Sequence, residues 1–323
     1  MFKSSCLRVL CALFVLVASA ISAADGPSQR QDLPGQLFRV GDHRLHLYCA
    51  GTGSPTVIFE SGLGGLGIEW MNLLQRVALT SRACLYDRAG YGWSEPGPLP
   101  RTAGRAADEL SALLAAARID GPLLLVAHSF GGYVAQTYVR RHPERVAGLV
   151  LVESSHPAQL ASFPVRRGHY CEALARGYPL RMDLRPRLAA GYPAAWRDVS
   201  LQLLLADKTA RAQLSELCNY AASASDAAGD DAPFPALPLV VISRGRAEFP
   251  ATPRGDALER AWAALQRELS LLTRGGLQQV ARDSGHHAHL DQPDLVVETA
   301  LSTLLLARHA APTAGQAQFA SDP

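Results

Sequence analysis

A buried strand that leads directly into a helix through a single serine constrains this chain more than any other feature. Residues 122–128 (PLLLVAH) form an apolar run, and Ser129 separates them from the stretch FGGYVAQTYVRR, which has a helical pattern. A second apolar run, VAGLVLV, follows at residues 146–152. Such continuous apolar runs are typical of parallel strands that helices cover on both faces. The segment therefore predicts a strand–helix–strand unit with a serine at the carboxyl end of its first strand.

The rest of the chain repeats this alternation. Two alternating runs around Gly41 and Asp42 predict a hairpin, which we expect at an antiparallel edge of the sheet. Thr102 is the expected N-cap of a helix. The predicted fold class is therefore α/β, a doubly wound and mostly parallel sheet with helices on both faces. The other strand-like runs lie at 56–62, 82–90, 238–243 and 277–285, and the other helical patterns at 102–119, 256–273 and 293–308.

Residues 155–235 interrupt this alternation. They are rich in Ala, Leu, Arg and Pro, have a helical tendency and contain no convincing strand. We therefore predict a helical insertion between two strands of the sheet, in a core made of residues 25–154 and 236–309. The last residues, 310–323, are small and polar and predict a flexible tail.

The first 24 residues have the pattern of a secretory signal peptide. Lys3 and Arg8 precede or enter an apolar run, and small residues follow it. A membrane anchor is the alternative, but the apolar run is short for a bilayer span. We expect cleavage near Ala24, a secreted or periplasmic protein, and no stable membrane insertion after cleavage.

Four cysteines remain without the signal peptide: Cys49, Cys84, Cys171 and Cys218. In an exported chain they predict up to two disulfides, with three possible connectivities. Cys171 with Cys218 is the simplest pair because both fall within residues 155–235. Cys49 and Cys84 are either neighbours in the sheet or buried thiols. No CxxC or HxxxH spacing occurs, which argues against a metal site.

Ser129 is a candidate nucleophile. A tight strand-to-helix turn lifts a serine hydroxyl clear of the sheet, and it needs small neighbours such as Gly131. The sequence reads A-x-S-x-G, with Ala127 in place of the usual first glycine. The helix behind the serine directs backbone N–H groups at the site, so the N–H of Phe130 is a candidate oxyanion donor. The alternative is an ordinary serine in a tight turn.

His286 is the candidate base. A serine hydroxyl is a poor nucleophile until a base takes its proton, and His286 follows Gly285 just after the last predicted strand. His287 and His289 are expected to be loop or packing residues, and His128 is expected to support the nucleophile.

A glycine-rich loop supplies the second oxyanion donor. The stretch FESGLGGLGIEW follows an early predicted strand, and such a loop can direct a backbone N–H at the same point as Phe130. The backbone N–H of Leu63 is the candidate. A phosphate-binding loop is the alternative, but no Lys-Ser/Thr follows the glycines and G-x-G-x-x-G is absent.

Four motifs, in the order ESGLGG, YDRAGYGWSEP, AHSFGGY and SGHHAHLDQPDLV, resemble those of the α/β-hydrolase superfamily. The resemblance covers residues 36–308 and implies an α/β-hydrolase fold, a serine nucleophile and a helical lid. The chain departs from the family pattern at Ala127 and at Ser61-Gly62, where many relatives have His-Gly. Neither departure removes a needed atom, because the oxyanion donors are backbone groups.

The resemblance leaves three candidates for the acid that orients the imidazole. Many relatives place it after the strand before the last, where Glu248 and Asp256 lie, Asp256 as an expected helix cap. Others place it at the end of the strand that follows the nucleophile helix, which here ends at Glu153. We rank Glu153 first, Glu248 second and Asp256 third. A hydrogen-bonded loop anchor is the alternative role for Glu153.

We therefore expect an enzyme that cleaves small-molecule carboxylic esters through an acyl-enzyme intermediate without a cofactor. Serine rather than aspartate at position 129 argues against the epoxide-hydrolase and haloalkane-dehalogenase branches. An aminopeptidase, lactonase, acyltransferase or non-catalytic binding protein remains as an alternative. The formal net charge of +2 argues against a nucleic-acid partner. The arginines of the predicted lid favour neutral or anionic substrates, and a solvated face is their alternative role. They are Arg166, Arg167, Arg176, Arg181, Arg185, Arg187 and Arg197.

Overall fold

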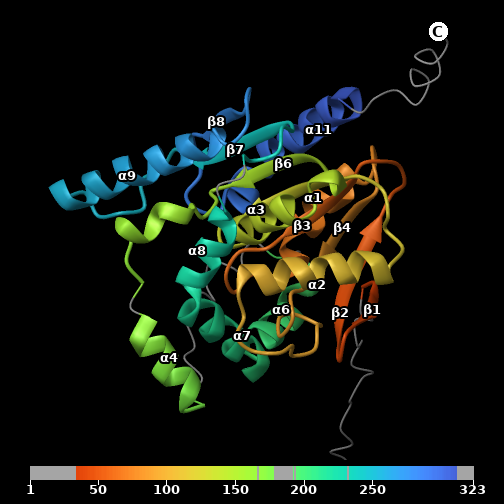
Figure 1. Ribbon diagram of the computed structural model, residues 1–323, viewed down its shortest axis with the longest axis horizontal. Coiled ribbons are helices and arrows are strands. Elements are labelled where there is room, and N and C mark those ends of the chain that lie inside the picture. Colours follow the sequence, from red (N-terminus) through yellow and green to blue (C-terminus); the bar gives the residue numbers. More distant parts are fainter. Residues whose placement is uncertain (1–33, 166, 178–191, 193, 231–232, 311–323) are drawn as a thin grey trace, which may run out of the picture. The chain divides into compact units, whose positions relative to one another are not determined.

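An eight-stranded sheet forms the centre of the protein. The computed structural model describes residues 34–165, 167–177, 192, 194–230 and 233–310 (Figure 1). The predicted signal peptide and residues 311–323 of the predicted tail lie outside this part of the chain. The strands are β1 (Gln36–Val40), β2 (His43–Ala50), β3 (Thr56–Glu60), β4 (Ala83–Tyr86), β5 (Leu123–His128), β6 (Val146–Val152), β7 (Leu239–Arg244) and β8 (Leu277–Ala281).

The spatial order of the strands is β1-β2-β4-β3-β5-β6-β7-β8. From β4 to β8 all neighbouring strands pair in parallel, whereas β1 and β2 are antiparallel. The predicted α/β class and the antiparallel hairpin edge are thereby confirmed. Cys49 of β2 lies opposite Cys84 of β4, and a disulfide joins them.

The strand that carries the candidate nucleophile lies inside the sheet. Every residue of β5 is buried, and in the neighbouring strand β6 only Ala147 is partly exposed. Helices cover both faces because these strands are apolar on both sides. The carboxyl end of β5, where Ser129 follows, therefore opens between neighbouring strands rather than at a sheet edge.

Two hydrophobic clusters divide the helices between the faces of the sheet. One contains residues of α2 (Ala103–Ala116), α3 (Gly131–Arg141) and α9 (Pro253–Ser270). The other contains residues of the 3-10 helix η1 (Gly67–Trp70), α1 (Met71–Val77) and α11 (Pro293–Ala310). Thr102 caps α2 as predicted, since its side chain accepts from the N–H of Arg105. The sequence did not indicate η1 and α1, which are short and follow a glycine-rich loop.

The segment predicted to be a lid, residues 155–235, contains helices but no strand in its described part. Two of these helices, α7 (Asp207–Cys218) and α8 (Tyr220–Ala228), contain several buried side chains. Another 3-10 turn, η2 (Pro143–Arg145), precedes β6, and α10 (Ala288–Asp291) follows β8. The helices of the lid segment are η3 (Pro157–Ala161), α4 (Arg167–Ala175), η4 (Ala194–Trp196), α6 (Arg197–Leu205), α7 (Asp207–Cys218) and α8 (Tyr220–Ala228).

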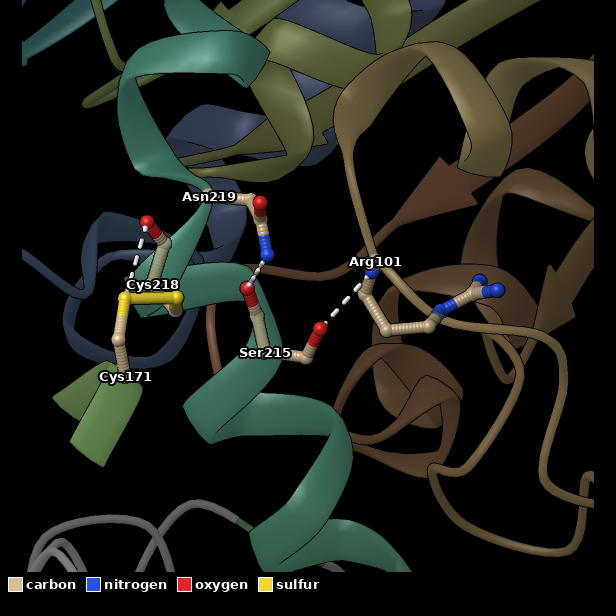
Figure 2. The surroundings of a disulfide bond; sticks show 5 residues. All are labelled: Arg101, Cys171, Ser215, Cys218 and Asn219. Carbon is tan, nitrogen blue, oxygen red and sulfur yellow. Dashed lines mark hydrogen bonds between the residues drawn. A yellow bond between two sulfur atoms is a disulfide. The ribbon is translucent and has the colours of Figure 1, made fainter. Parts of the chain in front are cut away.

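A disulfide between Cys171 and Cys218 joins α4 to α7 (Figure 2). The simplest pairing predicted from the sequence is thereby confirmed. Beside it, the Ser215 hydroxyl of α7 accepts a hydrogen bond from the backbone N–H of Arg101, 2.9 Å away. Helix α7 is therefore tied both to α4 and to the loop that precedes α2. Among the described helices, none combines the length and apolarity needed to cross a bilayer.

Candidate active site

Ser129 lies in the sharp turn between β5 and α3. Its φ is +51°, a left-handed conformation that costs a non-glycine residue about 1–2 kcal/mol. Two hydrogen bonds hold the turn, since the Ser129 N–H donates to the Val152 carbonyl and the Ser155 N–H donates to the Ser129 carbonyl. The strain is thus imposed by the neighbouring strand β6, and it exposes the hydroxyl at the end of the sheet.

The two glycines behind Ser129 are required by close packing. A Cβ on Gly131 would lie 2.6 Å from the backbone oxygen of Ser61. A Cβ on Gly132 would lie 1.7 Å from the Ser154 hydroxyl. Both distances are shorter than non-bonded contacts allow, so the small residues predicted from the turn chemistry are a steric necessity.

His286 reaches Ser129 from the loop after β8. Its Nε2 lies 3.0 Å from the Ser129 Oγ, within hydrogen-bonding distance. The backbone of His286 is held at both ends: its N–H donates to Glu248 Oε1 at 2.8 Å, and its carbonyl lies 2.9 Å from His128 Nε2. His128 therefore supports the loop that carries the imidazole.

Glu153 stands on the other side of the imidazole. Its Oε2 lies 3.3 Å from His286 Nδ1. Glu153 directly follows β6, has a φ of +46° and is fully buried. The carboxylate also accepts from the backbone N–H of Arg244 at 2.7 Å, from Arg244 Nη1 at 2.8 Å and from the Trp262 indole. Ser129, His286 and Glu153 thus form a continuous hydrogen-bonded chain.

The charge of Glu153 is decided by these partners. Burial alone would raise the pKa of the carboxyl, but the hydrogen bond to His286 and the charges of His286 and Arg244 outweigh it. The pKa of Glu153 is therefore held below its ordinary value. A carboxylate that stays ionised keeps the proton of the imidazole on Nδ1, which leaves Nε2 free to accept from Ser129.

The two lower-ranked acids have other positions. Glu248 binds the backbone of His286, as described above, and this contact is with the N–H rather than the ring. Asp256 lies in the first turn of α9, where Thr252 is the N-cap because its side chain accepts from the Gly255 N–H. The expectation that Asp256 caps this helix is wrong. Of the three candidates, Glu153 is the one whose carboxylate meets the imidazole.

The two candidate oxyanion donors flank Ser129. Phe130 directly follows it at the start of α3 and is fully buried. Leu63 follows Gly62, whose position beside the nucleophile is shown by the 3.2 Å that would separate an added Cβ from the Ser129 Cβ. The glycine-rich loop therefore packs against the nucleophile, as the sequence predicts for an oxyanion loop.

Three buried side chains behind the site, Glu69, His128 and His289, place potential metal-ligand atoms within 4.8 Å of one another. They are far apart in the chain, so no sequence spacing could reveal them. In a tetrahedral zinc site neighbouring ligand atoms lie about 3.4 Å apart, so these side chains would have to move closer to bind zinc. As they stand, His289 packs its ring on Trp70, with 4.4 Å between ring centroids. Burial and the neighbouring histidines hold the pKa values of His128 and His289 well below the ordinary value.

Comparisons with known proteins agree with this fold. Residues 57–299 match the model of the "Alpha/beta hydrolase family", and the chain belongs to that family. The chain is 26% identical over 304 residues to an uncharacterized protein of Schizosaccharomyces pombe, which covers 82% of this chain and 55% of that protein. The chain thus spans about half of this relative and a fifth or less of the next three curated relatives.

Two solved structures show the same fold at low sequence identity. A thermophilic esterase from Thermogutta terrifontis is 19% identical, with a TM-score of 0.61 over 84% of this chain and 99% of that chain. The epoxide hydrolase CorEH is 16% identical, with a TM-score of 0.64 over 84% of this chain and 98% of that chain. Because these two enzymes have different activities, the fold alone does not select a reaction.

Proposed function

We propose that this protein is a serine hydrolase that cleaves carboxylic esters through an acyl-enzyme intermediate. The observation that carries the proposal is the hydrogen-bonded chain from the Ser129 hydroxyl through His286 to Glu153, with distances of 3.0 and 3.3 Å. This order of nucleophile, base and acid is the arrangement that activates a serine for acyl transfer.

The reaction begins when His286 Nε2 takes the hydroxyl proton as Ser129 Oγ attacks the ester carbonyl. The resulting oxyanion accepts hydrogen bonds from the N–H groups of Leu63 and Phe130. His286 then gives its proton to the leaving alkoxide, and the alcohol departs from the acyl enzyme. A water molecule attacks the acyl carbon, His286 accepts its proton and returns one to Ser129 Oγ, and the carboxylic acid is released. Glu153 stabilises the imidazolium in both halves of the cycle.

The residue at position 129 supports this reaction over others on the same fold. A serine hydroxyl yields an ester intermediate that water hydrolyses at the acyl carbon. Four of the seven lid arginines lie outside the described residues, so the preference for neutral or anionic esters remains a prediction.

The protein is further proposed to be secreted or periplasmic. The charged and apolar pattern of residues 1–24 supports this location. So do the two disulfides, Cys49–Cys84 and Cys171–Cys218, because such bonds persist mainly in oxidising compartments.

A fluorophosphonate probe tests the nucleophile. We expect stoichiometric labelling of the purified protein and complete loss of labelling in Ser129→Ala. The control is Ser302→Ala, which should label like the wild type. The Ser302 hydroxyl lies on α11 and donates to backbone carbonyls of that helix. Labelling that persists in Ser129→Ala would refute the assignment.

Substrate panels test the reaction class. Short p-nitrophenyl esters should be hydrolysed with a burst of one p-nitrophenol per active site if deacylation is slow. Aminoacyl p-nitroanilides, lactones and mixtures of ester with acceptor alcohols serve as the comparison set. Faster turnover of an anilide or lactone, or transfer to the alcohol in place of hydrolysis, would replace the ester-hydrolase proposal with that activity.

A further inference from the structure

Arg88 is a buried cation enclosed by five acceptors. It lies two residues after β4 and is 3% exposed. Nη1 donates to Glu60 Oε1 at 2.6 Å, and Nε and Nη2 donate to the two oxygens of Glu216 at 2.9 and 3.2 Å. The remaining donors bind the carbonyl oxygens of Ser61 at 2.5 Å and Gly62 at 2.9 Å. All five N–H groups of the guanidinium are therefore used in a fixed, planar arrangement.

The contact with Gly62 acts directly on the candidate oxyanion donor. The Gly62 carbonyl and the Leu63 N–H belong to one planar trans peptide group, so they point in opposite directions. The carbonyl oxygen accepts from Arg88 at 2.9 Å and from the backbone N–H of Gly65 at 3.2 Å, so these two donors together fix the direction of the Leu63 N–H, and Arg88 is the charged one. A charged donor on the carbonyl also polarises the peptide, which makes its N–H a stronger donor.

Arg88 is itself held by the lid segment. Glu216 belongs to α7 and is 1% exposed. The Tyr91 hydroxyl donates to Glu216 Oε2 at 2.7 Å, which orients the carboxylate. Lys208 of the same helix donates to the Gly92 and Ser94 carbonyls at 2.6 and 2.7 Å. Helix α7 is thus docked along the YDRAGYGWS stretch that carries Arg88.

The electrostatic balance keeps this arginine charged. Burial alone would lower the pKa of Arg88, but Glu216 and Glu60 outweigh it and hold the pKa well above the ordinary value. Burial raises the pKa of Glu60 to about 6, even with Arg88 and Tyr86 beside it. Glu60 is therefore a weaker counter-ion near pH 6 than at alkaline pH.

We infer that Arg88 and Glu216 are positioning residues for the oxyanion hole, with Glu216 of the lid helix α7 holding the guanidinium that orients the Leu63 N–H. The inference rests on the proposed hydrolase function and extends it, because it makes one lid helix part of the machinery that stabilises the transition state. Removal of Glu216 should therefore impair the chemical step even where substrate still binds.

The test compares Glu216→Gln, Arg88→Lys and Tyr91→Phe with the control Glu109→Gln. Glu109 forms a similarly buried pair with Arg101, at 2.5 Å, but its contacts lie away from the oxyanion loop. For each purified protein we would measure kcat and KM for a p-nitrophenyl ester and the inhibition constant of a trifluoromethyl ketone. The ketone forms a hemiketal with the nucleophile, and its oxyanion occupies the same hole as the transition state.

We expect Glu216→Gln to lower kcat by about 10- to 100-fold with little change in KM, because a displaced oxyanion donor loses part of its contribution. The inhibition constant of the ketone should rise in parallel with the fall in kcat/KM. Arg88→Lys should also lower kcat with little change in KM, and Tyr91→Phe should lower kcat by a smaller factor. Tyr91→Phe keeps the buried ion pair and provides the test if the other variants do not fold.

The experiment distinguishes failure of the positioning role from failure of the proposed function. If the wild type hydrolyses the ester but the three variants match Glu109→Gln, or change KM alone, then the positioning role is wrong and the proposed function stands. A wild type that neither hydrolyses esters nor labels with fluorophosphonate overturns the proposed function and this role together.

Discussion

Two buried carboxylates, Glu153 and Glu69, lie near the histidines of the site and differ in charge. Glu153 is fully buried and Glu69 is 3% exposed. Glu153 accepts hydrogen bonds from Arg244, Trp262 and the His286 ring. Glu69 instead has His289 Nε2 at 3.8 Å, beyond hydrogen-bonding distance, and its Oε1 is buried without a hydrogen-bond partner.

The difference shows that donors, rather than burial, set the charge of a carboxyl group in this protein. Burial raises the pKa of both groups, but only Glu153 has enough donors and positive charge to reverse the effect. Burial raises the pKa of Glu69 to about 8, despite Ser61 and Arg88. Near pH 7 Glu153 is therefore an anion that can stabilise an imidazolium, whereas Glu69 is mostly a neutral acid.

The largest effect should follow from removing the charge of Glu153. Glu153→Gln keeps the shape but cannot stabilise the imidazolium or fix its tautomer, so kcat/KM should fall by roughly 10³- to 10⁴-fold. Ester hydrolysis and circular dichroism on the same preparations would measure the loss and check the fold. Glu109→Gln is the matched control, as a buried ion-pair carboxylate elsewhere. If kcat/KM falls by less than tenfold, Glu153 is a hydrogen-bonded loop anchor rather than the catalytic acid.

Glu69→Gln should change the pH dependence of stability. The folded-state pKa of Glu69 is raised, so its contribution is fully present below about pH 4.5 and is lost as the pH rises through about 8. With about 1.4 kcal/mol per pKa unit, ionisation of the wild-type residue should destabilise the fold by on the order of 4 kcal/mol by pH 9. Glutamine cannot ionise, so the variant should gain stability over the wild type across this range.

Urea unfolding of both proteins at intervals from pH 5 to 9 would measure this difference. Glu268→Gln on the exposed face of α9 is the control, because that carboxyl is half exposed, with a side-chain exposure of 57%. A constant difference in unfolding free energy from pH 5 to 9 would show that Glu69 is already ionised in the folded protein, contrary to the comparison with Glu153.

The smallest effect is expected at Glu248, the second-ranked acid. Glu248→Ala removes one acceptor from the His286 backbone, while Glu153 and His128 still hold the ring and the carbonyl. We expect kcat/KM to fall only about three- to tenfold, in line with the loss of one positioning hydrogen bond. The measurement is kcat/KM for ester hydrolysis by Glu248→Ala and Glu153→Gln. If kcat/KM falls as far in Glu248→Ala as in Glu153→Gln, the ranking of the two acids is wrong.

Local pattern predicted the elements of the core. Apolar runs located β5 and β6, and alternating runs located the hairpin of β1 and β2. The prediction that Thr102 is the N-cap of α2 is confirmed. The prediction that Asp256 caps α9 is wrong, because Thr252 is the N-cap of that helix. The short helix α1 was missed because its seven residues are too few for helical periodicity to emerge beside a glycine-rich loop.

Some residues of the candidate site also have a local sequence signature, and others have none. Turn chemistry singled out Ser129, and the Gly-His pair after the last strand singled out His286. Arg244 and Trp262, which hold Glu153, carry no local signature, since an arginine after a strand and a tryptophan in a helix are common. Arg88 lies within the quoted YDRAGYG motif, but its partner Glu216 is 128 residues away.

The amino-acid sequence by itself determined the order of the strands and of the longer core helices, the serine turn and the types of residue available for chemistry, because these depend on neighbours within one or two turns of chain. Only the tertiary structure decided which acid meets the imidazole, which carboxyl keeps its charge and which arginine orients the Gly62–Leu63 peptide. Those outcomes depend on burial and on donors brought together from distant segments, and no local pattern encodes the free energy of such contacts.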